Sequence, residues 1–367
     1  MNNYKSLKVL YNGKNVGTLA ITSDNLVAFQ YDEQWLVSGF SISPFSLPLE
    51  KKVFIPKFEP LDGLFGVFND SLPDGWGRLL VDRFLLKNKI EPQAINNLNR
   101  LALVDNSTMG ALTYFSEYKF DITLNDLSLD ELSKECENIL KTDYSQNLDE
   151  LFAQGGSSGG ARPKIHTKFN DEDWIIKFPS SFDLENIGQL EYDYSICAKE
   201  CGIIMPETNL FESKIYSGYF GVKRFDRQGD KKKHMVSVSG LLETTHRLPN
   251  LDYNLLMKLT LELTKDYSQI EQMFRLMCFN VFSHNRDDHS KNFSFLYEEK
   301  QGWKLSPAYD LTYSSSINGE HATTINGEGK NPSKDDILAV AKNIAMNEKL
   351  AKTIILEIEE KTQVLKH

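Results

Sequence analysis

The first part of the chain alternates apolar and polar positions and then changes to a helical period. Three short runs alternate in this way, and the turn dipeptide Asn12-Gly13 separates the first two: residues 7–11, 17–22 and 26–31. Alternation broken by turn signals predicts short β-strands joined as hairpins. Between residues 74 and 89 the large apolar side chains recur at helical spacing: Trp76, Leu79, Leu80, Phe84 and Leu85. A small β-rich unit followed by a helix is therefore expected.

The middle of the chain mixes both patterns. Helical and strand-like runs follow one another here: a helix at residues 92–103, a strand at 111–118 and a helix at 127–141. Two apolar runs come next, at residues 164–168 and 174–178, and the polar residues between them predict a hairpin with its turn at residues 170–172. Three more segments follow: a helix at residues 187–201 and extended runs at 208–211 and 219–225.

Helical periods dominate the chain from residue 252 onward. One hairpin-like insertion interrupts them, with runs at residues 292–297 and 303–305 around a turn at 298–302. The order of the elements therefore predicts a strand-rich lobe followed by a helical lobe.

The size and composition fit a soluble chain with more than one domain. A chain of 367 residues can bury more than one core. Hydrophobic residues make up 41% and charged residues 25%, as in ordinary globular proteins. The formal net charge of −10 argues against a broad direct grip on a phosphate backbone. Because no run of about 20 apolar residues occurs, we expect a cytoplasmic protein.

The four cysteines show neither a C-x-x-C pair nor a framework spacing: Cys136, Cys197, Cys201 and Cys278. We expect reduced thiols. Cys197 and Cys201 are four residues apart on a predicted helix and can face one another, but buried free thiols are commoner than a metal pair without further ligands.

One nonapeptide carries the strongest candidate chemistry. Residues 284–292 read His-Asn-Arg-Asp-Asp-His-Ser-Lys-Asn and contain the pattern R-D-x-x-x-x-N. Phosphoryl transfer needs a carboxylate that orients the attacking hydroxyl and an amide oxygen that holds a metal ion, and kinases use this spacing. After the predicted hairpin, Asp310 stands where a kinase carries its main Mg²⁺ ligand. This order favours a kinase-type site with Asp287 as the catalytic carboxylate and Asn292 and Asp310 as metal ligands.

Two other interpretations of the nonapeptide stay open. Asp287, Asp288 and Asn292 can form a plain polar turn after a helix, because Asn and Asp favour turns. A hydrolytic metal centre would have four candidate ligands: His284, Asp287, Asp288 and His289. Further His or Cys ligands at suitable spacing are missing, however. In the kinase interpretation His289 packs and hydrogen-bonds within the loop and fixes the chain around Asp287.

A lysine at the end of an apolar strand is a candidate phosphate ligand. Lys177 stands between Trp-Ile-Ile and Phe-Pro. Such a lysine either reaches solvent or points its ammonium group into a cleft, where it contacts the α- and β-phosphates. Glu191, in the following predicted helix, is placed to pair with it, and Glu185 and Asp193 are alternatives. Taken alone, each of these residues is more typical of a solvated surface.

The composition changes at residues 154–160, which read Gln-Gly-Gly-Ser-Ser-Gly-Gly and precede the lysine hairpin. A flexible lid whose backbone N–H groups approach phosphates would use these residues: Gly155, Gly156, Ser157, Ser158, Gly159 and Gly160. A plain Gly/Ser linker is the alternative. The Walker A pattern is absent. The lysine strand that follows favours the lid.

Residues 223–227, Lys-Arg-Phe-Asp-Arg, end the strand-rich part of the chain. Backbone groups of an extended hinge can hydrogen-bond an adenine edge, and a carboxylate there can accept from ribose hydroxyls. Lys223, Phe225 and Asp226 are therefore candidate nucleotide ligands, with an exposed charged turn as the ordinary alternative.

Together these segments resemble the HipA family of bacterial toxin serine/threonine kinases over nearly the whole chain. Residues 72–78, L-P-D-G-W-G-R, are similar to the family's N-terminal signature, and residues 157–164, S-x-G-G-A-x-x-K, to its phosphate loop. The resemblance implies these roles: Lys177 as the nucleotide lysine, Phe225 and Asp226 at the adenosine, Asp287 as the catalytic base, and Asn292 and Asp310 as Mg²⁺ ligands. Ser157 matches a loop serine whose autophosphorylation would expel the loop and silence the enzyme, and Ser158 beside it is a second candidate.

We therefore expect a protein serine/threonine kinase that uses ATP and Mg²⁺. The expected fold is α+β and protein-kinase-like, with a bilobal body and a small β-rich N-terminal domain. The expected domains are a HipA-type domain at residues 1–118, a strand-rich nucleotide-binding N-lobe at 119–226 and a helical catalytic C-lobe at 227–367.

The resemblance also implies partners. Family members commonly pair with a HipB-like antitoxin that carries a helix-turn-helix, so that DNA is contacted only through the antitoxin, and they phosphorylate a translation protein such as an aminoacyl-tRNA synthetase. No membrane contact is expected. Two alternatives remain for the activity: a small-molecule kinase of the aminoglycoside or choline type, and an inactive kinase-like scaffold that binds an antitoxin–DNA complex.

Overall fold

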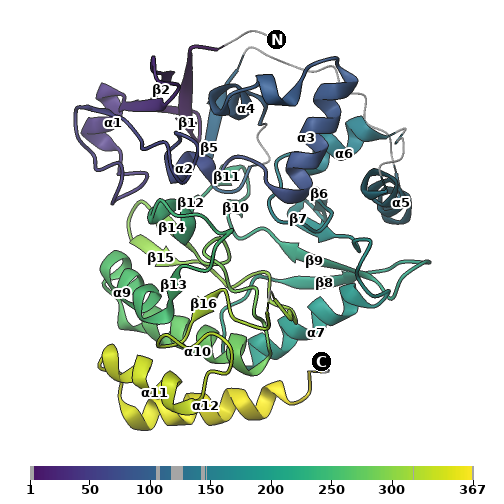
Figure 1. Cartoon of the computed structure of the whole chain (residues 1–367), viewed down its shortest axis with the longest axis vertical. Helices are drawn as coiled ribbons and strands as arrows, with labels where there is room; N and C mark the ends of the chain where they lie inside the picture. The colour runs from purple at the N-terminus through teal and green to yellow at the C-terminus, as the bar shows by residue number, and fades with distance from the viewer. Residues whose placement is uncertain are drawn as a thin grey trace. The chain divides into compact units, whose positions relative to one another are not determined.

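The chain packs as two compact units in the computed structural model (Figure 1). The structure describes residues 4–104, 108–116, 127–141, 145, 147–316 and 318–365. The first unit consists of residues 1–189, 209–236 and 240–244, and the second consists of residues 190–208, 237–239 and 245–367. The predicted division at residues 118 and 226 stays a prediction.

The first unit begins with a five-stranded antiparallel sheet of order β4-β3-β2-β1-β5. Its strands are β1 (Ser6–Tyr11), β2 (Lys14–Ile21), β3 (Val27–Tyr31), β4 (Val53–Phe54) and β5 (Leu112–Phe115). The register aligns a row of buried side chains across four strands: Leu7, Leu19, Phe29 and Phe54. The three predicted strands at the start of the chain are thus confirmed. Of the predicted strand at 111–118, residues 117 and 118 lie outside the described residues.

These helical segments of the first unit come before α6 (Leu148–Gly155): α1 (Glu33–Ser38), α2 (Gly66–Asn69), α3 (Gly75–Lys87), η1 (Pro92–Ala94), α4 (Asn97–Leu103) and α5 (Leu129–Leu140). The single helix predicted at residues 92–103 is wrong, because the chain is extended at Ile95 and Asn96. The Asn96 side chain accepts a hydrogen bond from the backbone N–H of Asn99 and starts a new helix, as Asn at an N-cap does. The helices predicted from residues 74 and 127 are confirmed.

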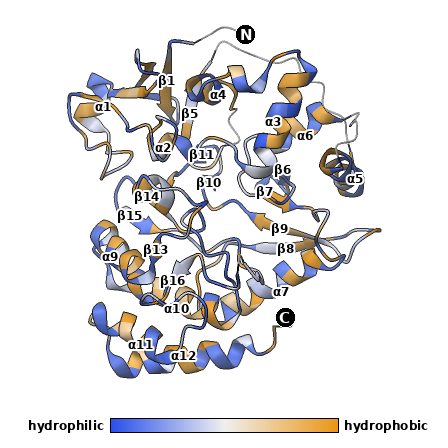
Figure 2. Cartoon of the chain, viewed as in Figure 1, coloured by the Kyte–Doolittle hydropathy of each residue, from blue (hydrophilic) through white to orange (hydrophobic). Residues whose placement is uncertain are grey.

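A second sheet of the chain has the order β6-β7-β9-β8. Its strands are β6 (Lys164–Phe169), β7 (Glu172–Lys177), β8 (Thr208–Phe211) and β9 (Tyr219–Lys223). Asn170 and Asp171 have positive φ angles and form the tight turn between β6 and β7, so the predicted hairpin is confirmed. Figure 2 shows apolar residues along β7 and β9. One buried cluster joins these strands to α3, α5 and α6 (Leu148–Gly155), and α6 was not predicted.

The second unit is mainly helical. Its long helices are α7 (Ile187–Glu200, from residue 190 onward), α9 (Tyr253–Thr264), α10 (Tyr267–Phe282), α11 (Lys334–Asn343) and α12 (Glu348–Thr362). α10 packs against both α9 and α12 and is buried along most of its last three turns. The predicted hairpin is confirmed as β14 (Ser294–Glu298) and β15 (Gly302–Leu305). Short elements complete the chain: β10 (Arg227–Gln228), β11 (Lys231–Lys232), β12 (His234–Ser237), α8 (Val238–Leu241), β13 (Leu251–Asp252) and β16 (Thr323–Thr324).

All four cysteines are free and buried, as predicted. No helix in the described parts of the chain combines the length and the hydrophobicity that crossing a bilayer requires.

Candidate active site

The loop that follows α10 holds the strongest candidate residues of the second unit. α10 ends at Phe282, and His284 then takes a positive φ angle that reverses the chain. Asn285 anchors the loop to the helix, because its backbone N–H donates to Asn280 O at 3.0 Å and its side-chain amide donates to Asn280 Oδ1 at 2.9 Å. The loop thus leaves the helix in a fixed direction.

Asp287 and Asn292 belong to one closed turn. The amide nitrogen of Asn292 donates to the backbone oxygen of Asp287 at 2.7 Å. The amide oxygen of Asn292, which is the atom that can bind a metal ion, therefore points away from that backbone oxygen. His289 accepts from the backbone N–H of Lys291 at 3.2 Å, and its Nε2 lies 3.9 Å from Asp287 Oδ1. The prediction that His289 fixes the loop is confirmed. The Asp287 side chain is 60% exposed and is therefore accessible to a substrate.

The β14–β15 hairpin returns the chain to this loop before Asp310. The backbone N–H of Ser306 donates to Ser294 O at 2.9 Å and closes the base of the hairpin. The Tyr309 hydroxyl donates to Lys291 O at 2.7 Å and shares a second hydrogen bond with the Ser294 hydroxyl. The residues that immediately precede Asn292 and Asp310 are thus hydrogen-bonded to each other. Both candidate metal ligands therefore lie at the base of one hairpin.

Asp288 has the opposite environment from Asp287. It is 1% exposed, and its carboxylate accepts from Tyr253 Oη at 2.9 Å, His321 Nδ1 at 3.0 Å and the backbone N–H of Thr323 at 3.2 Å. Within the described residues, no group of three or more His, Cys, Asp and Glu side chains is placed to hold a metal ion. The structure therefore does not support the hydrolytic metal centre. Mg²⁺ bound by one carboxylate and one amide would not need such a group, because it keeps several waters and phosphate ligands.

Two buried lysines face each other on the β6–β7 hairpin of the first unit. Lys177 is 8% exposed and Lys164 is 9% exposed, and the register pairs them directly. The ammonium group of Lys177 lies 5.5 Å from the centre of the Phe220 ring, and that of Lys164 donates to Gly159 O at 2.6 Å. Like charges at opposed positions destabilise a sheet, so this pair fits a site for a polyanion. The sequence predicted Lys177 as a phosphate ligand and Lys164 only as the last residue of the phosphate-loop signature. Their pairing depends on the two-residue turn at residues 170–171, which is one residue shorter than the predicted turn.

The Gly/Ser segment is docked on the first unit instead of extending as a linker. Ser157 and Ser158 are 8% and 1% exposed, and the Ser158 hydroxyl donates to Gly155 O at 2.6 Å. Gly160 has a φ angle of +79°, and its backbone N–H donates to the carboxylate of Asp74. These contacts agree with a built loop and not with a flexible Gly/Ser linker.

The three candidate acidic partners of Lys177 differ in burial. Glu191, on α7, is 2% exposed, whereas Glu185 and Asp193 are exposed. Burial favours Glu191, because a buried carboxylate requires a charged or hydrogen-bonding partner. Its pairing with Lys177 stays a prediction.

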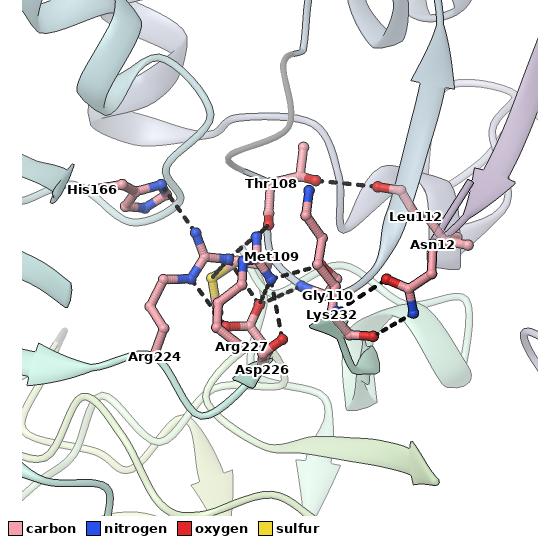
Figure 3. Close-up of polar contacts among 10 residues, drawn as sticks. All are labelled: Asn12, Thr108, Met109, Gly110, Leu112, His166, Arg224, Asp226, Arg227 and Lys232. Atoms are coloured by element: carbon pink, nitrogen blue, oxygen red, sulfur yellow. Dashed lines mark hydrogen bonds and ion pairs between the residues drawn. The ribbon is translucent and has the colours of Figure 1, made fainter. Parts of the chain in front are cut away.

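The candidate hinge residues have different surroundings, and Figure 3 shows those of Asp226. Lys223 forms an ion pair with Glu172 at 2.9 Å, and Phe225 is half-buried. The Asp226 carboxylate is 1% exposed and accepts from the guanidinium groups of Arg224 and Arg227 at 2.8 Å. It also accepts from the backbone N–H of Gly110 at 2.7 Å. These contacts do not fit the predicted role of Asp226 as an acceptor for ribose hydroxyls, because the carboxylate is already saturated within the protein.

The mixed α/β architecture and the order of loop, hairpin and carboxylate are those expected of a kinase-like protein. Residues 7–115 match the model of the HipA N-terminal domain, and residues 156–365 match that of the HipA-like C-terminal domain. The second match alone spans more than half of the chain, so the chain belongs to the HipA family, and the resemblance seen in the sequence is confirmed. The fold is mixed α/β and HipA-like, while the predicted arrangement of lobes stays a prediction.

Two curated relatives and one solved structure are similar to this chain. The chain is 24% identical over 367 residues to "Putative kinase Y4dM" of Sinorhizobium fredii, covering 94% of this chain and 87% of the relative. The chain is 26% identical to a "Putative kinase" of Haemophilus influenzae, over 43% of this chain and 52% of the relative. HipA in a solved complex of HipA, HipB and operator DNA from Shewanella oneidensis has a similar fold, with a TM-score of 0.74 and 17% identity over 98% of this chain and 89% of that chain.

Proposed function

We propose that this protein is an ATP-dependent serine/threonine protein kinase that acts as a HipA-like toxin. The base of the β14–β15 hairpin carries the proposal. Lys291 and Tyr309, which precede Asn292 and Asp310, are hydrogen-bonded to each other there. The Asn292 side chain also donates to the backbone oxygen of Asp287. An exposed carboxylate beside two oxygen ligands is the donor set that phosphoryl transfer from ATP requires.

In this proposal each residue of the second unit has one task. Asp287 accepts the proton of the substrate hydroxyl and orients that hydroxyl for attack on the γ-phosphorus of ATP. The new oxygen–phosphorus bond forms as the bond from the γ-phosphorus to the β,γ-bridging oxygen breaks, and ADP leaves. Asn292 and Asp310 hold Mg²⁺ through their side-chain oxygens. Mg²⁺ supplies charge neutralisation on the phosphate oxygens when it is bound. His289 positions the turn that carries Asp287, through the hydrogen bond that it accepts from the backbone N–H of Lys291.

Residues of the first unit are proposed to bind the nucleotide. Lys177 contacts the phosphates and pairs with Glu191, which belongs to the second unit, and the burial of both side chains supports these roles. Lys164 adds a second cation opposite Lys177. The backbone near Lys223 and Phe225 is the proposed contact for the adenine edge.

The Gly/Ser loop is proposed to be both a phosphate loop and a substrate. Gly159 and Gly160 lie next to the ammonium group of Lys164, so the loop is close to the proposed phosphate-binding cations. Ser157 and Ser158 are the proposed sites of autophosphorylation. Both serines are buried in the docked loop, so a serine must leave this position to accept a phosphoryl group.

The proposed partners follow from the family. The solved Shewanella complex contains HipB and operator DNA together with HipA, which supports a HipB-like antitoxin with a helix-turn-helix as the partner of this chain. The net charge of −10 favours contact with DNA through that partner. A translation protein such as an aminoacyl-tRNA synthetase is the proposed substrate.

Labelling with radioactive ATP tests the proposed function. Purified protein incubated with labelled ATP and Mg²⁺ should incorporate label at Ser157 or Ser158. Asp287→Gln should remove the label, while Asp149→Asn, which changes an exposed carboxylate on α6, should not. An unlabelled wild-type protein at every Mg²⁺ concentration would contradict the proposal. Transfer to amine-bearing alcohols but not to protein would favour a small-molecule kinase instead.

A further inference from the structure

The segment Asp74-Gly75-Trp76-Gly77 has no role in the chemistry proposed above, yet it contacts the Gly/Ser loop at every residue. Asp74 occupies the N-cap position of α3 and makes no side-chain capping hydrogen bond to that helix. Its carboxylate instead accepts from the backbone N–H of Gly160. An acidic N-cap residue usually satisfies its own helix, so this carboxylate is directed to the loop.

Trp76 holds the loop and the strand after it with both of its N–H groups. Its backbone N–H donates to Gly160 O at 2.9 Å, and its indole Nε1 donates to Lys164 O at 3.2 Å. The indole is 1% exposed and belongs to the core of the first unit. The contact is therefore built on a rigid part of the fold.

The two glycines of the segment are required by the close approach of the loop. Gly75 has a φ angle of +44°, and a Cβ atom there would overlap the carbonyl group of Gly160. A Cβ atom on Gly77 would overlap the carbonyl oxygen of Ser158. Glycine inside a helix lowers helix stability, so its presence at residue 77 indicates a packing requirement.

We propose that residues 74–77 form a cradle that holds the Gly/Ser loop in its docked conformation, with Asp74 as a positioning residue for the loop. Two hydrogen bonds and a close backbone contact fix Gly160, a second close contact fixes Ser158, and a third hydrogen bond holds Lys164. In this docked loop both serines are buried. The cradle thus sets how often the loop is released.

The consequence for regulation rests on the proposed autophosphorylation. A phosphoryl group on Ser157 or Ser158 carries about −1.5 to −2 charges at neutral pH. The Asp74 carboxylate lies against the following glycine, since a Cβ on Gly159 would be 3.2 Å from Asp74 Oδ1. The cradle would therefore accept the unmodified loop and repel the modified one.

Amide hydrogen exchange of the whole chain without nucleotide tests the cradle directly. Asp74→Ala and Gly77→Ala should each speed exchange of the peptide that spans residues 156–163 by about tenfold or more, because a charge-assisted hydrogen bond is lost or a methyl group displaces the loop. Asp74→Asn keeps an acceptor and should give an intermediate rate. Asp149→Asn should exchange as the wild type does, because Asp149 pairs with Lys87 outside the cradle.

Thermal melting separates loop release from loss of the fold. Gly77→Ala should melt lower than the wild type, because its Cβ atom would overlap Ser158 O and lie 2.9 Å from Pro73 Cβ. A Gly77→Ala variant that still unfolds cooperatively should show faster loop exchange. If Asp74→Ala fails to fold, the loop exchange rates of Gly77→Ala and Asp74→Asn test the cradle in its place. Wild-type exchange rates in the folded variants would overturn the cradle. Faster exchange in a protein that takes no label from ATP would leave the cradle intact and refute only the kinase.

Discussion

Neighbouring carboxylates in the loop after α10 are placed in opposite environments. The Asp287 side chain is 60% exposed, whereas the Asp288 side chain is fully buried and joins α9, the loop and residues 321–323 through its hydrogen bonds. Burying a carboxylate is costly unless it is fully hydrogen-bonded, and Asp288 meets this condition. Asp288 therefore supports the fold of the loop that presents Asp287.

This contrast predicts different losses for two similar substitutions. Asp287→Asn should leave the free energy of unfolding within about 0.5 kcal/mol of the wild type and abolish phosphoryl transfer. Asp288→Ala should destabilise the protein by about 3 kcal/mol, because it leaves buried donors without an acceptor. Chemical denaturation together with a transfer assay measures both effects. Equal destabilisation by the two changes would contradict the assignment.

Asp226 illustrates a buried charge that is compensated by two others. Burial by itself would raise the pKa of Asp226, but Arg224 and Arg227 outweigh that effect and lower the pKa to about 2. The same guanidinium groups donate to Thr108 O at 2.7 and 2.6 Å, so the cluster ties residues 108–110 to the end of β9 (Figure 3).

Removing the carboxylate of this cluster should be costly. Asp226→Ala leaves two buried guanidinium groups without their acceptor and should lower the free energy of unfolding by about 3–5 kcal/mol. Asp149→Ala, which removes a carboxylate from an exposed ion pair, should cost less than about 1 kcal/mol. Chemical denaturation of the two variants provides the comparison. Similar stabilities would show that the cluster does not hold the fold.

His234 should make stability depend on mildly acidic pH. It is completely buried, and burial lowers its pKa from 6.5 to about 4, although its hydrogen bond with Ile42 O acts in the opposite direction. Between pH 6.5 and pH 4 the unfolded chain takes up a proton on this residue and the folded chain does not. Its contribution to stability is therefore present above pH 6.5 and is lost as the pH falls toward 4.

The size of this effect follows from the difference in pKa. As the pH falls from 6.5 to about 4, protonation of His234 in the unfolded chain should lower the free energy of unfolding by roughly 3 kcal/mol. His234→Gln, which keeps a donor for Ile42 O, should reduce the slope of stability against pH in that window. Denaturation at several pH values measures the slope, and an unchanged slope would contradict the buried neutral state.

At the scale of elements, hydrophobic period and turn residues predicted the hairpins well. The β6–β7 and β14–β15 hairpins formed because each has a short polar turn between apolar runs. The period alone could not show that Asn96 caps a new helix. α6 was missed because its eight residues form a window too short for a clear helical period. The order of the candidate residues was readable, whereas the buried bonds of Asp226 and the contact of Asp74 with Gly160 depend on tertiary packing.

The opposed lysines of the β6–β7 hairpin give an element-scale prediction. Lys164→Met and Lys177→Met should each reduce the thermal stabilisation produced by ATP with Mg²⁺, because each removes a cation from the proposed phosphate site. Lys168→Met is the matched control on the same hairpin, since the Lys168 side chain is 67% exposed. Differential scanning fluorimetry measures the shifts. Equal stabilisation of all three variants by ATP would place the phosphates elsewhere.

At the scale of the whole molecule, the candidate residues are distributed over two compact units. The first unit contains Lys164, Lys177 and the Gly/Ser loop, and the second contains Asp287, Asn292 and Asp310. Membership of the HipA family accounts for both sets in one chain. The proposed function requires that residues of both units act on the same nucleotide, so their substitutions should not be independent.

The rate of phosphoryl transfer from ATP to the Gly/Ser loop tests this requirement most directly, measured in the wild type, Lys177→Met, Asp287→Gln and the double variant. Residues that act as one catalytic unit give strongly non-additive losses. If Lys177 and Asp287 act on one nucleotide, each single change should reduce transfer to the residual rate, and the double variant should be no slower than the slower single variant. Transfer at the wild-type rate in Asp287→Gln, or losses that multiply in the double variant, would contradict action on one nucleotide.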